Sequence, residues 1–279
     1  MVSVSSSRQS RLTSDRARPA NSFSDSVSRL LDRIDCRRAD NDQEREAIAR
    51  LRYEAYLREG AISPNSTRRF ADPDDDSENA YLFGLYIDGE LASSIRMHVS
   101  TPEHPDFPSL HVFADVLQPY LDAGKTIIDT TRFVADEKLS RRYRGLAYAT
   151  LRVSWLTGRY FNADYSLAAV RAEHQAFYRR TFHHQLICEP RAYPRLDKPI
   201  CLMTIPYRAV AEDVQRRYPF FRSTFFERRM LFERSPRATG RSKDKAVASP
   251  QQPSELLGTN SPFVESAPVV PARRSPAPV

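Results

Sequence analysis

"IIDTTRFVADEKLSRRYRGLA", residues 127–147, holds the passage from a strand to a long helix on which the fold prediction depends. It opens with two isoleucines, as a buried strand does, and then places Asp129 and Arg132 three positions apart. In a regular strand, side chains at this spacing point to opposite faces of the sheet. Either a β-bulge brings the two charges together, or they have separate roles.

The segments around this stretch predict alternating strands and helices. Residues 80–99 read as a hairpin around Asp88-Gly89, since both central positions of a two-residue turn need positive φ. Arg96 alternates with apolar residues on its second strand, so it points to a polar or ligand-facing side. Further helices are expected in 43–59, 113–124 and 172–182, a turn followed by a long helix in 139–163, and further strands in 164–170 and 198–207. This order predicts an α/β fold with a mixed, mostly antiparallel central sheet flanked by helices.

Composition divides the chain into three parts. Residues 1–27, rich in serine and arginine, and residues 235–279, rich in proline, serine and alanine, are expected to be disordered, leaving a domain over 28–234. The two ends contribute +2 and +3 of the formal charge of +7, so the basic pI near 9.4 says little about nucleic acid, and no nucleic-acid partner is expected. Only 8 glycines in 279 residues disfavour a dinucleotide-binding or P-loop fold.

The sequence contains no apolar run long enough for a membrane span and no signal-peptide pattern, so a cytoplasmic location is expected. Cys36, Cys188 and Cys201 are too scattered for a disulfide framework and are expected to be free thiols. The adjacent His183 and His184 have no acid or cysteine at ligand spacing. We therefore expect no metal and no cofactor.

Two motifs resemble the GNAT acyltransferase superfamily. "RRYRGLA" matches its R/Q-x-x-G-x-G/A signature at Arg142, Gly145 and Ala147, where a helix N-terminus receives a phosphate. "VRAEHQAFYRRTF", residues 170–182, is similar to the N-x-x-A-x-x-x-Y-x-x-x-G-F stretch through Tyr178, but has His174 where asparagine is usual. The resemblance implies a GNAT-like fold.

A narrower resemblance, over residues 34–207, is to acyl-homoserine-lactone (autoinducer) synthases and the related N-acyl amino acid synthases. The shared pattern is R-x-x-x-aromatic, D-x-x-D, a strand arginine and then acid-x-x-R-F; it falls on Arg52, Tyr56, Asp72, Asp75, Arg96, Asp129, Arg132 and Phe133. The chain lacks the tryptophan and the W-E-x-S-R-F strand usual in autoinducer synthases. These departures favour the N-acyl amino acid synthase branch.

This resemblance implies transfer of a long-chain acyl group from an acyl carrier protein thioester, or from acyl-CoA, to the amine of an amino acid. An acid such as Asp129 would take the amine proton, Arg132 would line the reaction centre and Tyr178 would protonate the leaving thiolate. The remaining site residues are expected to bind the acceptor (Arg52, Tyr56, Asp72, Asp75 and Arg96) or the phosphopantetheine of the donor (Arg141, Arg142, Arg144, Gly145 and Ala147).

Several alternatives remain open at this point. The protein is also compatible with an acyl-homoserine-lactone synthase using S-adenosylmethionine, an acetyltransferase using acetyl-CoA, or a non-catalytic module that binds an acyl carrier protein. Asp129 and Arg132 are equally compatible with a buried network that ties their strand to Arg52 and the Asp72/Asp75 loop. The aromatic segment 218–232 either lines an acyl tunnel or closes the core.

Overall fold

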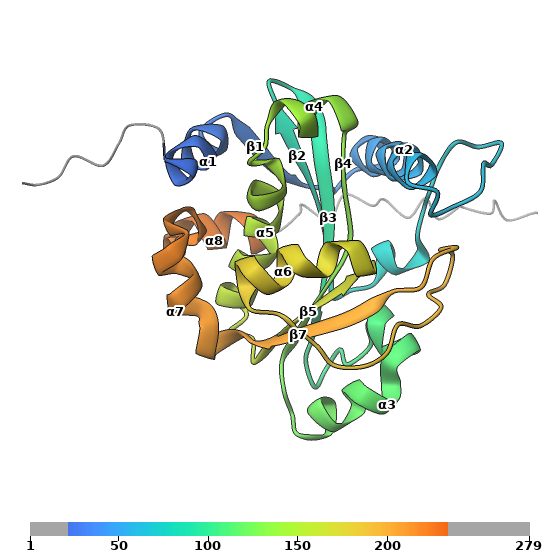
Figure 1. Cartoon of the computed structure of the whole chain (residues 1–279), viewed down its shortest axis with the longest axis vertical. Helices are drawn as coiled ribbons and strands as arrows, with labels where there is room; N and C mark the ends of the chain where they lie inside the picture. The colour runs from blue at the N-terminus through green and yellow to red at the C-terminus, as the bar shows by residue number, and fades with distance from the viewer. Residues whose placement is uncertain (1–21, 234–279) are drawn as a thin grey trace, which may run out of the picture. The chain divides into compact units, whose positions relative to one another are not determined.

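The computed structural model describes residues 22–233, which form one seven-stranded sheet with helices on both faces (Figure 1). The order across the sheet is β1-β2-β3-β4-β5-β7-β6. The strands are β1 (Ile34–Arg38), β2 (Ala80–Ile87), β3 (Glu90–Ser100), β4 (Ile127–Ala135), β5 (Tyr165–Val170), β6 (Gln185–Leu186) and β7 (Cys201–Pro206). The helices are α1 (Phe23–Leu31), α2 (Asp42–Arg58), α3 (Pro108–Asp122), α4 (Glu137–Arg142), α5 (Leu146–Tyr160), α6 (Gln175–Phe182), α7 (Tyr207–Arg217) and α8 (Phe225–Phe232), with 3-10 turns η1 (Pro73–Asp76), η2 (Ala172–His174) and η3 (Pro219–Phe221).

All neighbouring strands are antiparallel except β4 and β5, which run parallel. The predicted hairpin is confirmed: Asp88 and Gly89, between β2 and β3, have φ of 53° and 88°. The sheet is mixed and mostly antiparallel, with helices on both faces, so the predicted fold class is confirmed.

Two features of β4 shape the centre of the sheet. Its pairing with β5 ends at Thr130 opposite Ala168, although both strands continue, so the two strands diverge. Against β3, Arg96 faces Thr131 and Ser94 faces Val134, so a single β3 residue opposes two β4 residues. One of these two is Arg132, with φ of 54°. This is the β-bulge that the sequence left as one of two possibilities.

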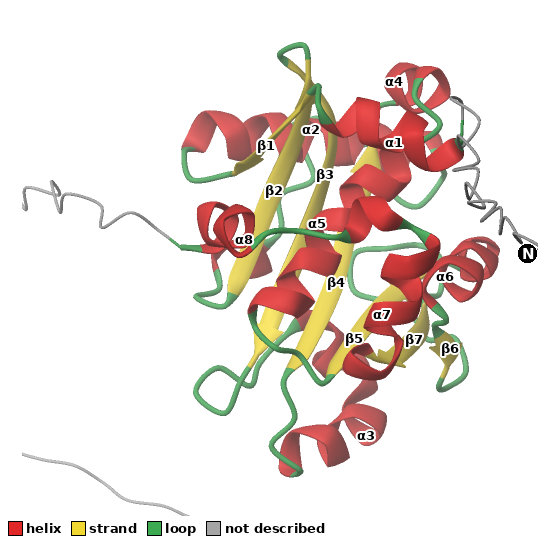
Figure 2. Ribbon diagram, turned by 90° about the vertical axis from the view of Figure 1, so that its left-hand side faces the viewer, coloured by secondary structure: helices red, strands yellow, loops and turns green. Residues whose placement is uncertain are grey.

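The two faces of the sheet are covered differently (Figure 2). On one face, α5 packs on β3 and β4 and buries the apolar alternation of β3, such as Ile95 and Met97, with Trp155 and Phe182 in one large core. On the other face, α2 packs on the same strands. That face carries the polar alternation of β3, including the fully buried Arg96.

Several sequence expectations need correction. Helix α1 begins at Phe23, inside the segment expected to be disordered, because Val27 is fully buried beside α5. Within residues 139–163 a turn and then a long helix were expected; the long helix is α5, but the chain before the turn forms the short helix α4. Strand β1, helix α7 and the short β6 were not predicted. The disorder expected for residues 1–21 and 235–279 lies outside the described residues. None of the helices between residues 22 and 233 is long and apolar enough to cross a bilayer.

Candidate active site

A cavity of about 490 Å³ lies where β4 and β5 diverge. Helix α2, the end of β5, helix α6 and the segment before β7 close its sides. Its polar lining includes Glu59, Thr131, Arg132, Arg171 and His174, and its apolar lining includes Phe133, Val134, Val170, Phe177, Leu196 and Ile200. A volume of this size is typical of small-molecule sites.

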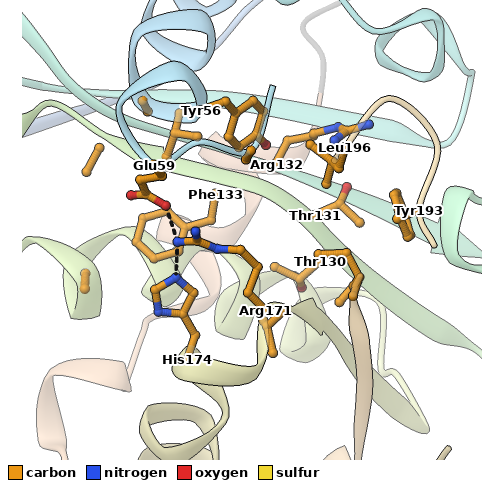
Figure 3. A pocket seen from close by; sticks show the side chains of 18 of the residues that line it. Tyr56, Glu59, Thr130, Thr131, Arg132, Phe133, Arg171, His174, Tyr193 and Leu196 are labelled. Carbon is orange, nitrogen blue, oxygen red and sulfur yellow. Dashed lines mark hydrogen bonds and ion pairs between the residues drawn. The ribbon is translucent and has the colours of Figure 1, made fainter. Parts of the chain in front are cut away.

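Arg132 is one of the sequence-predicted site residues that line this cavity (Figure 3). The bulge turns its side chain to the face of Asp129, where its Nε donates to Asp72 Oδ2 at 2.6 Å. The guanidinium carbon lies 4.9 Å from the ring centroid of Phe70 and 5.8 Å from that of Tyr193. Among the described residues, none accepts a hydrogen bond from the two terminal nitrogens. Asp72 therefore fixes the Nε side of the guanidinium, while the fork of two terminal nitrogens has no acceptor within the described residues.

Behind Arg132, arginines and aspartates form a buried ion network. Both terminal nitrogens of Arg52 bind the Asp75 carboxylate, at 2.6 and 3.1 Å. Nη1 of Arg96 lies 3.0 Å from Asp75 Oδ1 and 3.2 Å from Asp72 Oδ2. Arg52 and Arg96 are fully buried. The network joins α2, β3 and β4 to the loop that carries the two aspartates.

Electrostatics keeps this network ionised. Burial alone would raise the pKa of Asp72, but the guanidinium groups of Arg132 and Arg96 hold it at about 2. The pKa of Asp75 is also lowered, since Arg52 outweighs the effect of burial. Asp72 thereby fixes Arg132, while Asp75 joins Arg52 to Arg96. Of the residues predicted to bind the acceptor, Arg52, Asp72, Asp75 and Arg96 lie in this network, and only Tyr56 lines the cavity.

Asp129 is fully buried on the same face of the sheet. Its carboxylate accepts hydrogen bonds from the backbone nitrogen and the hydroxyl of Ser109, at 3.0 and 2.8 Å. Burial raises its pKa, with the Ser109 bonds acting in the opposite direction. Asp129 does not line the cavity. Burial, and then the Asp129 charge, nevertheless raise the pKa of Tyr193, which does line the cavity. The catalytic role expected for Asp129 stays a prediction.

Three side chains from separate elements meet at the cavity wall, as Figure 3 shows. Arg171, just after β5, forms an ion pair with Glu59 at the end of α2 and lies 2.8 Å from Nε2 of His174. Lys198 donates to the backbone carbonyl of Glu59 at 2.9 Å. We call Glu59, Arg171 and His174 the clasp. Burial, and then the Arg171 charge, lower the pKa of His174, so its imidazole is neutral at pH 7.

Tyr178, the predicted acid, lies on α6 and lines the cavity. It is 6% exposed, and burial raises the pKa of its hydroxyl. A buried phenol of this kind keeps its proton at neutral pH. The geometry is compatible with proton donation to a leaving group, and that role stays a prediction.

The turn predicted to bind the donor begins beside the cavity. Ala147, in the first turn of α5, lines it, whereas Arg141, Arg142 and Arg144 are exposed. A Cβ on Gly145 would lie 3.0 Å from Cγ2 of Val27 on α1, so close helix packing is a second reason for glycine there. The turn thus offers a helix N-terminus and a basic exposed surface side by side.

Sequence reasoning missed the clasp and Tyr193. Glu59 and Tyr193 stand in no motif, Arg171 lies in the 170–182 stretch but was given no role, and His174 was noted only as a departure from that motif. Their common feature is spatial, since α2, the end of β5 and the loop before β7 meet only in the folded chain. No signal in the sequence marks them. Within residues 22–233, no group of three or more His, Cys, Asp or Glu side chains is placed to hold a metal ion.

Comparisons with known proteins bear on this geometry. The family model described as "N-acyl amino acid synthase FeeM" matches residues 47–206. A search of curated proteins gives no match. Among solved structures, FeeM, an N-acyl amino acid synthase from uncultured soil microbes, is 19% identical with a TM-score of 0.55, covering 66% of this chain and 98% of its own.

Two further solved structures are similar to this chain. TofI, in a ternary complex with an inhibitor and MTA, is 14% identical with a TM-score of 0.50, covering 68% of this chain and 100% of its own. BjaI, a CoA-dependent acyl-homoserine lactone synthase with MTA, is 14% identical with a TM-score of 0.46, covering 67% and 89%. The family model spans more than half of the sequence, from α2 to β7. The chain therefore belongs to the N-acyl amino acid synthase FeeM family and is an acyl-transferring N-acyltransferase.

Proposed function

We propose that the protein transfers a long-chain acyl group from an acyl carrier protein thioester to the amine of an amino acid, giving an N-acyl amino acid. The observation that carries this proposal is the pair of Arg132 terminal nitrogens, which have no hydrogen-bond acceptor within residues 22–233 and belong to a cavity with an apolar lining. A carboxylate matches a guanidinium fork in shape and charge. An apolar cavity beside it suits an acyl chain.

The backbone supports a binding role for Arg132. Positive φ in a residue other than glycine costs about 1 kcal/mol or more, and glycine would avoid that cost. An arginine at this position therefore adds local backbone strain, and what it provides in return is its side chain. Asp72 holds its Nε, so little further ordering is needed when a carboxylate binds the terminal nitrogens. Such pre-organisation favours an acceptor with an α-carboxylate.

The lining supports an acyl donor. Aromatic and aliphatic side chains from β4, β5, α6 and the segment before β7 face the cavity. Each buried methylene contributes about 0.8 kcal/mol, so eight additional methylenes add about 6 kcal/mol if the cavity accommodates them. A long chain would accordingly bind much more tightly than an acetyl group.

The reaction requires no covalent enzyme intermediate. The neutral amine attacks the thioester carbon, and its nitrogen becomes positively charged. The C–S bond then breaks, the thiolate takes a proton and the nitrogen loses one. Backbone N–H groups of β4 beyond Thr130, where pairing with β5 has ended, are candidates to stabilise the oxyanion. Tyr178 would protonate the thiolate, and Asp129 would receive the amine proton through water or Tyr193.

The donor is proposed to be an acyl carrier protein because of the exposed arginines at the α4–α5 turn. Arg141, Arg142 and Arg144 form a basic surface beside Ala147, where a phosphopantetheine would enter. An acidic carrier protein would be attracted there by charge, and the attraction would weaken as salt rises.

Mass spectrometry of the products tests the proposal. Purified protein is mixed with long-chain acyl carrier protein and pooled amino acids and, separately, with S-adenosylmethionine. We expect a new N-acyl amino acid that is lost in Asp129→Asn and Arg132→Ala but kept in Arg50→Ala, which changes an exposed arginine of α2. An acyl-homoserine lactone would overturn the acceptor assignment. Equal use of acyl-CoA would overturn the donor assignment, and absence of any product would overturn the proposed function.

A further inference from the structure

Helix α8 exposes three large apolar side chains to solvent. Phe225, Phe226 and Met230 are 65%, 70% and 69% exposed. Only two other large hydrophobic residues of the described part of the chain are exposed, Phe23 and Leu186, and each is less than half exposed. Single exposed hydrophobic residues are ordinary, but three on an eight-residue helix form a patch that calls for a partner.

The fold holds this patch outward. Arg152 on α5 binds both oxygens of Glu227 and the backbone carbonyls of Phe220 and Arg222, while Phe232 is buried in the main core. These contacts fix which side of α8 faces the protein. The exposure of the patch is therefore a consequence of the packing of the opposite side.

Basic side chains surround the patch. Arg222 and Arg229 are exposed, and Arg228 is half-buried at the start of the helix. The guanidinium of Arg229 lies 5.8 Å from the ring centroid of Phe225. The acids nearby are already paired, Glu227 with Arg152 and Glu233 with Arg229. The surface around the apolar patch thus carries a positive excess.

We propose that α8 binds an anionic lipid surface, with Phe225, Phe226 and Met230 inserted between head groups and the arginines beside phosphates. Aromatic and apolar side chains on one side of a helix, with arginines at the border, are typical of interfacial anchors. An acidic protein partner would be attracted mainly by charge, yet two arginines of this surface, Arg152 and Arg229, are already paired with Glu227 and Glu233. The three exposed apolar side chains therefore favour the lipid.

The position of α8 agrees with this role. It packs against α5, on the face of the sheet opposite α2 and the cavity wall that α2 provides (Figures 1 and 2). Binding through α8 would leave the cavity wall formed by α2 accessible. The proposal does not depend on the proposed reaction, although an N-acyl amino acid would itself partition into such a surface.

Co-sedimentation of the full chain with vesicles tests the inference. We expect binding to phosphatidylcholine vesicles that contain phosphatidylglycerol and weak binding to phosphatidylcholine alone. The triple variant Phe225→Ser/Phe226→Ser/Met230→Ser should bind about tenfold more weakly, and Arg222→Gln/Arg229→Gln should lose the preference for anionic lipid. Leu186→Ser, a matched change of an exposed apolar residue on β6, should bind as the unmodified protein does.

A fluorescence variant gives a second readout. The only tryptophan, Trp155, is 4% exposed, so Phe226→Trp adds a solvent-exposed reporter. Its emission should shift to the blue when anionic vesicles are added. Unchanged emission together with vesicle binding that survives the triple substitution would overturn the inference. So would a patch-dependent dimer in analytical ultracentrifugation, or patch-dependent binding to an acyl carrier protein without vesicle binding.

Discussion

The two faces of β3 are stabilised by different interactions. Toward α5, Ile95 and Met97 pack in an apolar core. Toward α2, Arg96 and His98 lie in a network of charges that is equally buried. An apolar core tolerates substitution by another apolar side chain of similar shape. A buried charge network depends on every partner, because removing one charge leaves another without compensation. Adjacent residues of one strand should therefore respond very differently to substitution.

The largest effect is expected for Arg96→Met. It would leave Asp72 and Asp75 with less compensating charge and should lower the free energy of unfolding by about 3–5 kcal/mol. Met97→Leu, the neighbouring change on the apolar face, should cost less than about 1.5 kcal/mol. Urea unfolding measures both. A loss below about 1 kcal/mol for Arg96→Met would remove the contrast between the faces.

The next effect concerns recognition at the edge of the network. Arg132→Lys keeps the charge but loses the fork, so kcat/KM for the preferred amino acid should fall about 100-fold. The corresponding amine without a carboxylate should change less than about threefold. Arg195→Lys is the matched control, since Arg195 also has positive φ and stacks on Phe70 but does not line the cavity. Equal losses for both acceptors would contradict carboxylate binding by Arg132.

A smaller effect on stability is expected for His184, a buried titratable residue on the otherwise apolar side. Its ring lies against Tyr178 and Phe182, and both ring nitrogens are buried without a hydrogen-bond partner among the described residues. Burial lowers its pKa to about 3. The unfolded chain, with a histidine pKa near 6.5, then binds more protons, so stability falls as the pH drops below about 6.5.

Between pH 7 and pH 5 the His184 imidazole should lower the free energy of unfolding by about 2 kcal/mol. His184→Leu should remove that share, which unfolding at the two pH values measures. His98 is the comparison on the charged face: burial and then Arg96 lower its pKa to about 3, and it keeps a 3.0 Å contact with the Asp74 carbonyl. An unchanged pH dependence in His184→Leu would show that the loss has another origin.

The smallest effect is expected for Glu59→Gln in the clasp. The Glu59 side chain is 40% exposed, and ion pairs with exposed members contribute about 1 kcal/mol or less. The free energy of unfolding should change by less than about 1 kcal/mol, in contrast to Arg96→Met. A loss above about 2 kcal/mol in thermal unfolding would place the clasp with the buried network.

Much of the site was predictable because its residues recur in an ordered pattern. The network residues Arg52, Asp72, Asp75 and Arg96 were all identified from that pattern, as was Arg132. Their roles were not predictable in the same way. Whether a guanidinium faces a carboxylate of its own chain or a cavity depends on the approach of the 71–79 loop to β3 and β4, which is a contact between distant segments.

Local sequence was enough to predict the elements whose cause is local: the hairpin at Asp88-Gly89, the helix expected over 43–59 and found over 42–58, and, apart from α4 and β6, the order of strands and helices from β2 to β7. Tertiary structure decided the bulge at Arg132, the divergence of β4 from β5, the clasp and the outward side of α8. The physical reason is that these features depend on pairing and packing between residues far apart in the chain. Local propensity and spacing do not encode such contacts.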